Sequence, residues 1–437
     1  MTRCCAYLLS ECSLHISAAV LVAAIVVGPA TATAFPGLSN FLSGARTSST
    51  AAREAALAVV QRDAEALSTL GESLPSLTIA GTWTVNQYEA SLGAGQSGGQ
   101  EIVIQPHNGL AGYAQVSVPL INASAWQKHG AAKLTAKAAE RSAEVTRLEV
   151  DRQVAQYYFS VVGAEALRQA HAESLAAAQE TLDVTRARQD EGAATRLDVA
   201  RAAADVEKAR QDAAVQDYAA AIARRALSTL SGVPADSEAP GLQDDLHEEA
   251  GLKTWEAKVG NGLPPIDAAV LTRRAADKQA SSAWMSLVPT LDATAREDLT
   301  NTAGFLGRHE YFTAMLSLTW RLDVKSVGQI RARQAGAAFA HVQEEGARAS
   351  ARDTVHEAWQ RVRTGIIRSQ AARAQVAQSR IAADAARERY AAGTGTQLDL
   401  IQARRDLGSA EASRIQADAD LSFARVLLRL SAGEAVD

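Results

Sequence analysis

The sequence predicts a mainly α-helical protein with short membrane-type β-strands, built from a unit that occurs twice. Two observations support this prediction. A glycine-containing break interrupts a very long, alanine-rich helical pattern at two places, around Gly192 and around Gly393. Ahead of each long pattern lie short stretches in which apolar and small polar side chains alternate with a period of two, as in half-exposed strands.

The two breaks match each other without gaps at a constant offset. The matched pairs are Gly192 with Gly393, Thr195 with Thr396, Leu197 with Leu398, Asp198 with Asp399, Ala202 with Ala403 and Asp205 with Asp406. The same register holds upstream, where it joins Val154 to Val355, Tyr158 to Trp359 and Val161 to Val362. Such self-similarity indicates an internal duplication, in which each copy is a helical hairpin with its turn at the glycine.

Residues 1–34 are expected to form a secretory signal peptide. The apolar run Ile16–Val27 is too short for a stable membrane span, and the small residues around Ala34 suit a cleavage site. All three cysteines precede this run, at positions Cys4, Cys5 and Cys12. A mature chain without cysteine would exclude disulfides and thiolate metal sites.

Composition narrows the function further. The chain has 437 residues, of which 47% are hydrophobic and 21% charged, so it can bury a large core. A net charge of -5, with basic residues spread evenly among acidic ones, gives no indication of nucleic-acid binding. No later apolar stretch approaches the roughly 20 residues that a spanning helix needs. If the protein enters a membrane, we expect it to do so by strands.

The first repeat is expected over residues 35–233. Its elements are a helix at 51–70, strands at about 77–88 and 112–120 with a short strand at 102–104 between them, and a hairpin at 122–231. At 1.5 Å per residue, the arm from 122 to the break at Gly192 is roughly 100 Å long, which exceeds what a globular domain needs.

A linker or equatorial region follows at 234–265, rich in proline, glycine and acidic residues. Its acidic cluster is Asp244, Asp245, Glu248 and Glu249. We expect a solvated turn here in preference to a metal site, because only the single His247 accompanies the carboxylates.

The second repeat is expected over residues 266–437. It repeats the order of the first, with a helix at 266–287, strands at about 291–297 and 311–320, and a hairpin at 323–430. On the helices, apolar side chains recur at intervals of four and three residues and predict a packing seam. The seam positions are Val154, Tyr157, Val161, Val355, Trp359 and Val362.

Four short strands cannot close a sheet within one chain, and an open edge is not tolerated in hydrocarbon. We therefore expect neighbouring copies to complete a membrane β-barrel, with lateral packing of the hairpins into a helical wall. Candidate interface aromatics are Trp83, Tyr88, Tyr113, Tyr311, Phe312 and Trp320. A soluble β-sandwich edge and an ordinary two-stranded coiled coil are the alternatives for the strands and the helices.

The mature chain resembles the outer membrane efflux protein family, the TolC-like channel-tunnels. The resemblance rests on the duplicated strand-strand-hairpin order, on the Leu74-Pro75-Ser76-Leu77 entry to the first strand, and on a motif at both breaks. That motif is an Arg or Tyr, then a Gly, then a Ser or Thr with an acidic residue three positions later. The resemblance implies a homotrimer with a twelve-stranded barrel in the outer membrane and an α-helical tunnel in the periplasm.

The resemblance also implies that both breaks form the periplasmic aperture and the docking surface for a periplasmic adaptor. The residues concerned are Arg188, Gly192, Thr195, Asp198, Arg389, Tyr390, Gly393, Thr396, Asp399 and Gln402. Thr195 with Asp198, and Thr396 with Asp399, are also capping boxes, which alone would explain them. Gln402 stands at a position that is acidic in the family and Gly395 at a basic latch position, so the latch differs here.

No constellation indicates an enzyme, and we expect no catalytic, cofactor-binding or metal-binding residue. The Gly93–Gly99 loop fits a dinucleotide pattern and a nucleophile elbow, but both require a helix where Ile102–Ile104 reads as a strand. The expected function is a passive exit duct in the outer membrane, served by an adaptor and by a proton-driven or ABC-type inner-membrane pump. The alternative is a periplasmic coiled-coil structural or adaptor protein with a small β domain.

Overall fold

The computed structural model describes residues 35–93, 102–237, 239–241, 244–303, 307–434 and 436. The expected signal peptide, the three cysteines and most of the Gly93–Gly99 loop lie outside these residues. Residues 35–437 form one unit.

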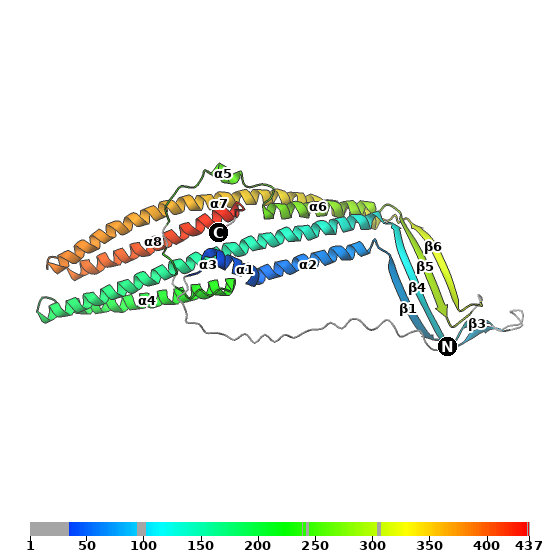
Figure 1. Ribbon diagram of the computed structural model, residues 1–437, viewed down its shortest axis with the longest axis horizontal. Coiled ribbons are helices and arrows are strands. Elements are labelled where there is room, and N and C mark those ends of the chain that lie inside the picture. Colours follow the sequence, from blue (N-terminus) through cyan, green and yellow to red (C-terminus); the bar gives the residue numbers. More distant parts are fainter. Residues whose placement is uncertain are drawn as a thin grey trace. The chain divides into compact units, whose positions relative to one another are not determined.

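The first half of this unit runs from helix to strands to a long hairpin (Figure 1). Its elements are α1 (Leu38–Ser48), α2 (Thr50–Gly71), β1 (Ser76–Val85), β2 (Ala90–Leu92), β3 (Ile102–Gln105), β4 (Asn108–Ile121), α3 (Ala123–Asp190) and α4 (Arg196–Ser231). A single residue, Asn122, separates β4 from α3, and its side chain caps the helix by accepting a hydrogen bond from the Ala125 amide at 3.0 Å. Strand and helix are therefore joined almost directly.

The second half repeats this order. Its elements are α5 (Leu252–Glu256), α6 (Pro264–Met285), β5 (Thr290–Thr300), β6 (Glu310–Thr319), α7 (Val324–Ala391) and α8 (Gln397–Ser431). Proline opens α6, where a missing amide hydrogen costs nothing. Asp323 caps α7 by accepting from the Ser326 amide at 2.7 Å. The expected 266–287 helix and 291–297 and 311–320 strands thus coincide, within a few residues, with α6, β5 and β6.

A four-stranded antiparallel sheet has the order β1-β4-β5-β6, so the two strand pairs meet at β4 and β5. A separate two-stranded ribbon joins β2 to β3. The ladder places Leu77, Ile79 and Trp83 on the same face as Val116 and Leu318, and this apolar face is largely exposed. The opposite face is mostly polar. The alternation expected from the sequence therefore produces one apolar and one polar surface.

The helices form a layer in which neighbours run side by side (Figure 1). At the end near the strands the order is α2-α3-α6-α7, because α3 packs against α2 and α6, and α6 packs against α7. Toward the hairpin turns, α3 packs against α4 and α8, and α8 against α7. Gly163 and Gly365 let α8 approach closely, since a Cβ at these positions would lie 3.3 and 3.2 Å from Ala419 and Leu421.

Two hydrophobic clusters secure the bases of the hairpins. The cluster of the first hairpin contains Phe41, Leu42, Ala45, Val150, Val154, Val161, Leu227 and Ala235. The cluster of the second contains Trp255, Val355, Ala358, Val362, Ile366, Leu421, Ala424, Leu428 and Ala432. The expected seam is present in both, with one correction. Tyr157 is half-exposed, and Tyr158 instead packs 5.9 Å from the Phe41 ring, because the α1 side of α3 is the covered one.

Within the described ranges, every helix is either too short or too polar to cross a membrane.

Candidate functional site

The two hairpin turns have the same backbone. Gly192 and Gly393 both adopt a left-handed conformation, with φ of +78° and +77°, which favours glycine. In each turn the amide after the glycine donates to the carbonyl of an arginine, from Ala193 to Arg188 at 2.7 Å and from Thr394 to Arg389 at 3.0 Å. The long helix thus ends and the chain reverses within five residues.

Each return helix begins with a complete capping box. In the first turn the Asp198 amide donates to Thr195 Oγ1 at 3.2 Å, and the Thr195 amide donates to Asp198 Oδ2 at 3.0 Å. In the second turn Thr396 and Asp399 exchange the same two hydrogen bonds, both at 3.2 Å. Hydrogen bonds from the threonine side chain, and then from its amide, lower the pKa of Asp198 and Asp399 below their ordinary range.

Arg188 joins the first turn to the second. Its guanidinium donates to the carbonyls of Tyr390 and Ala391, at 2.8 and 2.9 Å, and lies 4.5 Å from the centre of the Tyr390 ring. These carbonyls end α7, where main-chain acceptors lack helical partners and the helix dipole favours a cation. Arg188 therefore caps the C-terminal end of helix α7, which belongs to the other hairpin.

A second set of contacts lies farther from the turns, along α3. The Tyr390 hydroxyl is 3.3 Å from Thr185 Oγ1, and Thr185 is fully buried. On α8, Arg404 donates to the Ala177 carbonyl at 2.7 Å and to the Thr181 hydroxyl on α3. Burial, and then repulsion from Arg387, lowers the pKa of Arg404 from its ordinary value. Polar contacts between α3 and the α7–α8 hairpin therefore continue beyond the turns.

The structure does not bring all of the expected site residues together. Gln402 is exposed and donates to Asp406 at 3.0 Å, on its own helix. Arg389 is exposed and contributes its carbonyl to the turn, while its charge helps to lower the pKa of Asp399. Gln397, which was not expected at the site, is buried at 3% exposure, and its amide group has no hydrogen-bond partner within the described residues.

The contact made by Arg404 was missed by the sequence analysis, although one signal pointed to it. Arg404 matches Ala203 at the repeat offset, so one hairpin has a charge where the other has a methyl group. Such a difference between matched positions indicates a contact that only one copy makes.

The acidic cluster of the linker is not a solvated turn, which corrects the expectation for Asp244 and Glu249. Both side chains are largely buried, and both bind the Arg425 guanidinium of α8, at 2.8 and 2.7 Å. The carbonyl of His247 accepts a further hydrogen bond at 2.8 Å. The segment is thereby fastened to the second hairpin, because a buried arginine requires partners for its donors. Asp245 and Glu248 stay exposed.

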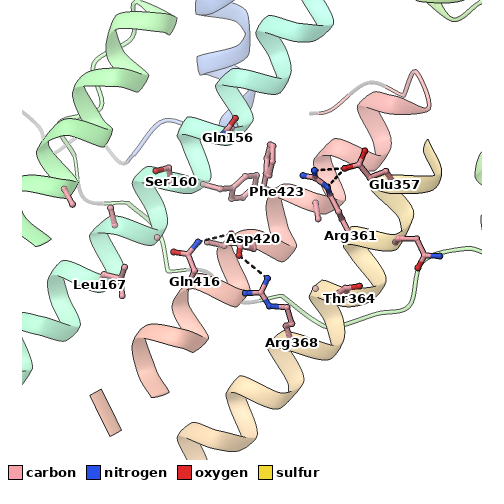
Figure 2. A pocket seen from close by; sticks show the side chains of 18 of the residues that line it. Gln156, Ser160, Leu167, Glu357, Arg361, Thr364, Arg368, Gln416, Asp420 and Phe423 are labelled. Atoms are coloured by element: carbon pink, nitrogen blue, oxygen red, sulfur yellow. Dashed lines mark hydrogen bonds and ion pairs between the residues drawn. The ribbon is translucent and has the colours of Figure 1, made fainter. Parts of the chain in front are cut away.

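A hollow of about 780 Å³ lies where α3, α4, α7 and α8 meet (Figure 2). Phe159, Leu167 and Phe423 give it apolar walls. Its charged side chains pair with one another, Arg361 with Glu357 at 2.7 Å and Arg368 with Asp420 at 3.7 Å. These pairs lie on exposed helix faces, and nothing in their geometry activates a nucleophile or a base. Within the described ranges, no three histidine, cysteine or carboxylate groups are placed to hold a metal ion.

Comparisons with known proteins agree with this architecture. A model of the family described as outer membrane efflux protein matches residues 41–233 and 262–434. No curated protein sequence matches the chain.

Three solved structures share the fold at low sequence identity. A membrane protein from Pseudomonas aeruginosa is similar at 21% identity and a TM-score of 0.78, with 91% of this chain and 93% of that chain covered. The outer membrane protein VceC from Vibrio cholerae has 16% identity, a TM-score of 0.77, and coverage of 92% and 97%. The open state of the outer membrane channel MtrE from Neisseria gonorrhoeae has 20% identity, a TM-score of 0.73, and coverage of 92% and 90%.

Proposed function

This chain belongs to the outer membrane efflux protein family, and from that premise we propose that it is the outer-membrane exit duct of a tripartite efflux or secretion system. Three copies form a twelve-stranded barrel in the outer membrane and a helical tunnel in the periplasm. The duct conducts substrates passively from an inner-membrane pump and a periplasmic adaptor to the exterior. Residues 35–233 and 266–437 are its two repeats, and 234–265 is the equatorial region between them.

The observation that supports this proposal most strongly is the incomplete sheet. In the described chain β1 and β6 each pair along one edge only. The apolar face is open as well, with Ile79 at 75% and Leu318 at 70% exposure. Unpaired edges are costly in hydrocarbon, and an open apolar sheet is costly in water. Pairing of β6 in one copy with β1 in the next satisfies both requirements and turns the apolar face toward lipid.

The edges of the helical layer support self-association in the same way. At the end near the strands α2 and α7 are the outermost helices. Both expose large apolar side chains, Leu57 and Leu67 on α2 and Phe339 and Val342 on α7. Burying such side chains against a neighbouring copy contributes about 25 cal/mol per Å² of apolar surface.

The hairpin turns are the proposed periplasmic entrance and adaptor-docking surface. Leu197 and Leu398 occupy matched positions and are exposed to almost the same extent, 57% and 56%. We propose these two leucines as side chains that contact the adaptor, because they occupy the same exposed position in both turns. Threefold symmetry brings the three Asp399 carboxylates toward the axis, where a ring of negative charge favours cations.

The first experiment tests the duct itself. The protein is purified in detergent, its mass is measured by light scattering, and it is added to planar lipid bilayers. We expect a trimer mass and stable conducting steps. The second candidate function, a periplasmic coiled-coil adaptor, is favoured by the long hairpins and predicts a protein that is soluble without detergent and forms no pore. That result would overturn the proposed duct.

The second experiment tests the entrance. Asp399→Asn should shift the reversal potential of the pore toward anions, because it removes one negative charge per copy near the axis. Asp198→Asn is the matched control, since it makes the same change in the other capping box. A photo-crosslinking residue at position 197 or 398 should capture the adaptor in cells, whereas one at the exposed Tyr218, far along α4, should not. Equal shifts from both aspartates would refute a special role for Asp399.

A further inference from the structure

The polar face of the β-sheet contains a cluster of side chains that lies outside the hairpin-turn site. The ladder places the even-numbered residues of β5 on this face, between the odd-numbered residues of β4 and β6. Asp298 lies opposite Tyr113 on one side and Tyr311 on the other. Arg296, two residues earlier on the same face, pairs with Gln115 and Thr313.

Arg296 is held by two neighbours. Its Nε donates to Asp298 Oδ2 at 2.8 Å, and its Nη2 donates to Asp298 Oδ1 at 2.6 Å. The guanidinium carbon lies 3.8 Å from the centre of the Tyr113 ring, a distance at which the ring face attracts a cation. Asp298 is only 15% exposed. Two-pronged pairing and stacking fix the position of this arginine along the sheet.

The chain connections on either side of β5 show where the cluster lies along this strand. β5 begins shortly after α6, so Thr290 is at the helical end and Thr300 at the loop end. Arg296 and Asp298 lie in the half near the loop. There the Asn301 side chain bridges to β4, accepting from the Leu110 amide at 2.8 Å and donating to the Asn108 carbonyl at 2.9 Å. The cluster thus lies on a well-connected part of the sheet, remote from the hairpin turns.

Charge on the polar face is confined to one strand. Among the ladder residues of the four strands, the ionisable carboxylates and cations facing this side are Asp292, Arg296 and Asp298. Arg296 and Asp298 neutralise each other, so Asp292 remains as one negative charge per copy. Glu297 and Glu310 point to the opposite, apolar face, because they alternate with this set.

We propose that Arg296, Asp298 and Tyr113, together with Asp292, form a second selectivity site on the inner wall of the duct, at its strand end, for small cations and cationic groups of permeating molecules. The proposal rests on the proposed function, since closure of the sheet is what turns the polar face inward. An unpaired arginine here would create a positive ring and favour anions. Asp298 cancels that charge, and the Tyr113 ring keeps the guanidinium against the wall.

The alternative is that the pair only stabilises the sheet, as polar pairs on one face of a sheet do. This alternative predicts that removing either charge destabilises the sheet, and that Asp292→Asn leaves the wild-type ion preference unchanged. The two explanations are therefore separated by a measurement of ion preference.

The test measures the reversal potential of purified trimers in planar bilayers under a KCl gradient. Asp298→Asn should shift it toward anions, because Arg296 becomes an uncompensated cation. Arg296→Gln should shift it toward cations, and Asp292→Asn should remove part of the wild-type cation preference. Glu297→Gln is the matched control, with the same change of charge one residue away on the opposite face. It should leave the reversal potential unchanged.

Each outcome is decisive. Unchanged selectivity in Asp298→Asn and Arg296→Gln, or an equal shift in Glu297→Gln, overturns the second selectivity site while the duct remains. If Asp298→Asn fails to assemble, the opposite shifts expected for Arg296→Gln and Asp292→Asn decide the question. If wild-type protein forms no pore at all, the proposed duct fails first.

Discussion

The two hairpin turns share a backbone but differ in what surrounds them. Gly192 and Gly393 have nearly identical φ angles, and both return helices open with the same capping box. Yet Arg188 of the first turn reaches across to the end of α7, whereas the matched Arg389 lies exposed at its own turn. The local sequence therefore determines the backbone of each turn. Contacts from the neighbouring hairpin determine whether that turn is stabilised further.

The start of the return helix shows the same contrast. Gln397 and Leu400 are both 3% exposed, but the matched Arg196 is exposed and Val199 is half-buried. The start of α8 is thus covered at a level where the start of α4 is still open to solvent. We expect changes at the first turn to be felt at the second, and the reverse to hold much less.

The largest expected effect is that of Arg188→Ala. It removes two charge-assisted hydrogen bonds and the contact with the Tyr390 ring, so residues 389–400 should open more easily, by on the order of 2 kcal/mol. Hydrogen exchange of the second turn measures this opening. Arg389→Ala is the matched control and should leave the first turn unchanged. Equal effects from both arginines would show that the turns are not held asymmetrically.

Next in size are the glycine substitutions. Gly192→Ala and Gly393→Ala should each cost about 1–2 kcal/mol, because an L-residue is strained at positive φ. A Cβ at either position has no described neighbour within 4 Å, so strain alone acts and the two costs should be equal. Proteolytic cleavage rates at each turn provide the measurement. A clearly larger cost at Gly393 would mean that the backbone equivalence is incomplete.

The caps come third. Thr195→Ala and Thr396→Ala should each destabilise the start of the return helix by about 1 kcal/mol, since the Asp198 or Asp399 amide loses its acceptor. Serine retains the hydroxyl, so Thr195→Ser and Thr396→Ser are the controls and should restore protection of these amides in hydrogen exchange. Loss of protection in the serine variants would argue that packing of the threonine methyl group dominates.

The smallest effect is a loosening of both turns in acid. The folded-state pKa of Asp198 and Asp399 lies below the ordinary value of 3.8, so their stabilisation is present above that value and is lost as the pH falls through the folded-state pKa. Pepsin cleavage at the turns should therefore increase in that window. Asp198→Asn and Asp399→Asn should abolish the pH dependence, each at its own turn. A pH dependence that survives in both variants would point to other groups.

Much of this arrangement could be predicted from sequence. Periodicity located the long helices and the four strands of the main sheet to within a few residues, because helix and strand periods are fixed by backbone geometry. The capping boxes were also predictable, since Thr195 and Asp198 interact across only three residues. The positions of the two turns were predictable as well, because a glycine breaks each long helical pattern.

Contacts between distant segments could not be predicted. Asp244 and Glu249 look like a solvated acidic turn until Arg425 is placed beside them, nearly 180 residues later in the chain. Tyr158 replaced Tyr157 in the core because α1 covers one side of α3, and neighbouring residues on a helix differ by about 100° in direction. Gln397 is buried because helix α3 of the first hairpin lies next to its helix.

The single residue between β4 and α3 has a mechanical consequence. With only Asn122 as a joint, a twist applied to the strand is passed to a 68-residue rod with little slack to absorb it. Extra residues inserted there would decouple the two, whereas the connection around Asn301 could be lengthened without disturbing the rod. We therefore expect the tilt of β4 and the inclination of α3 to change together.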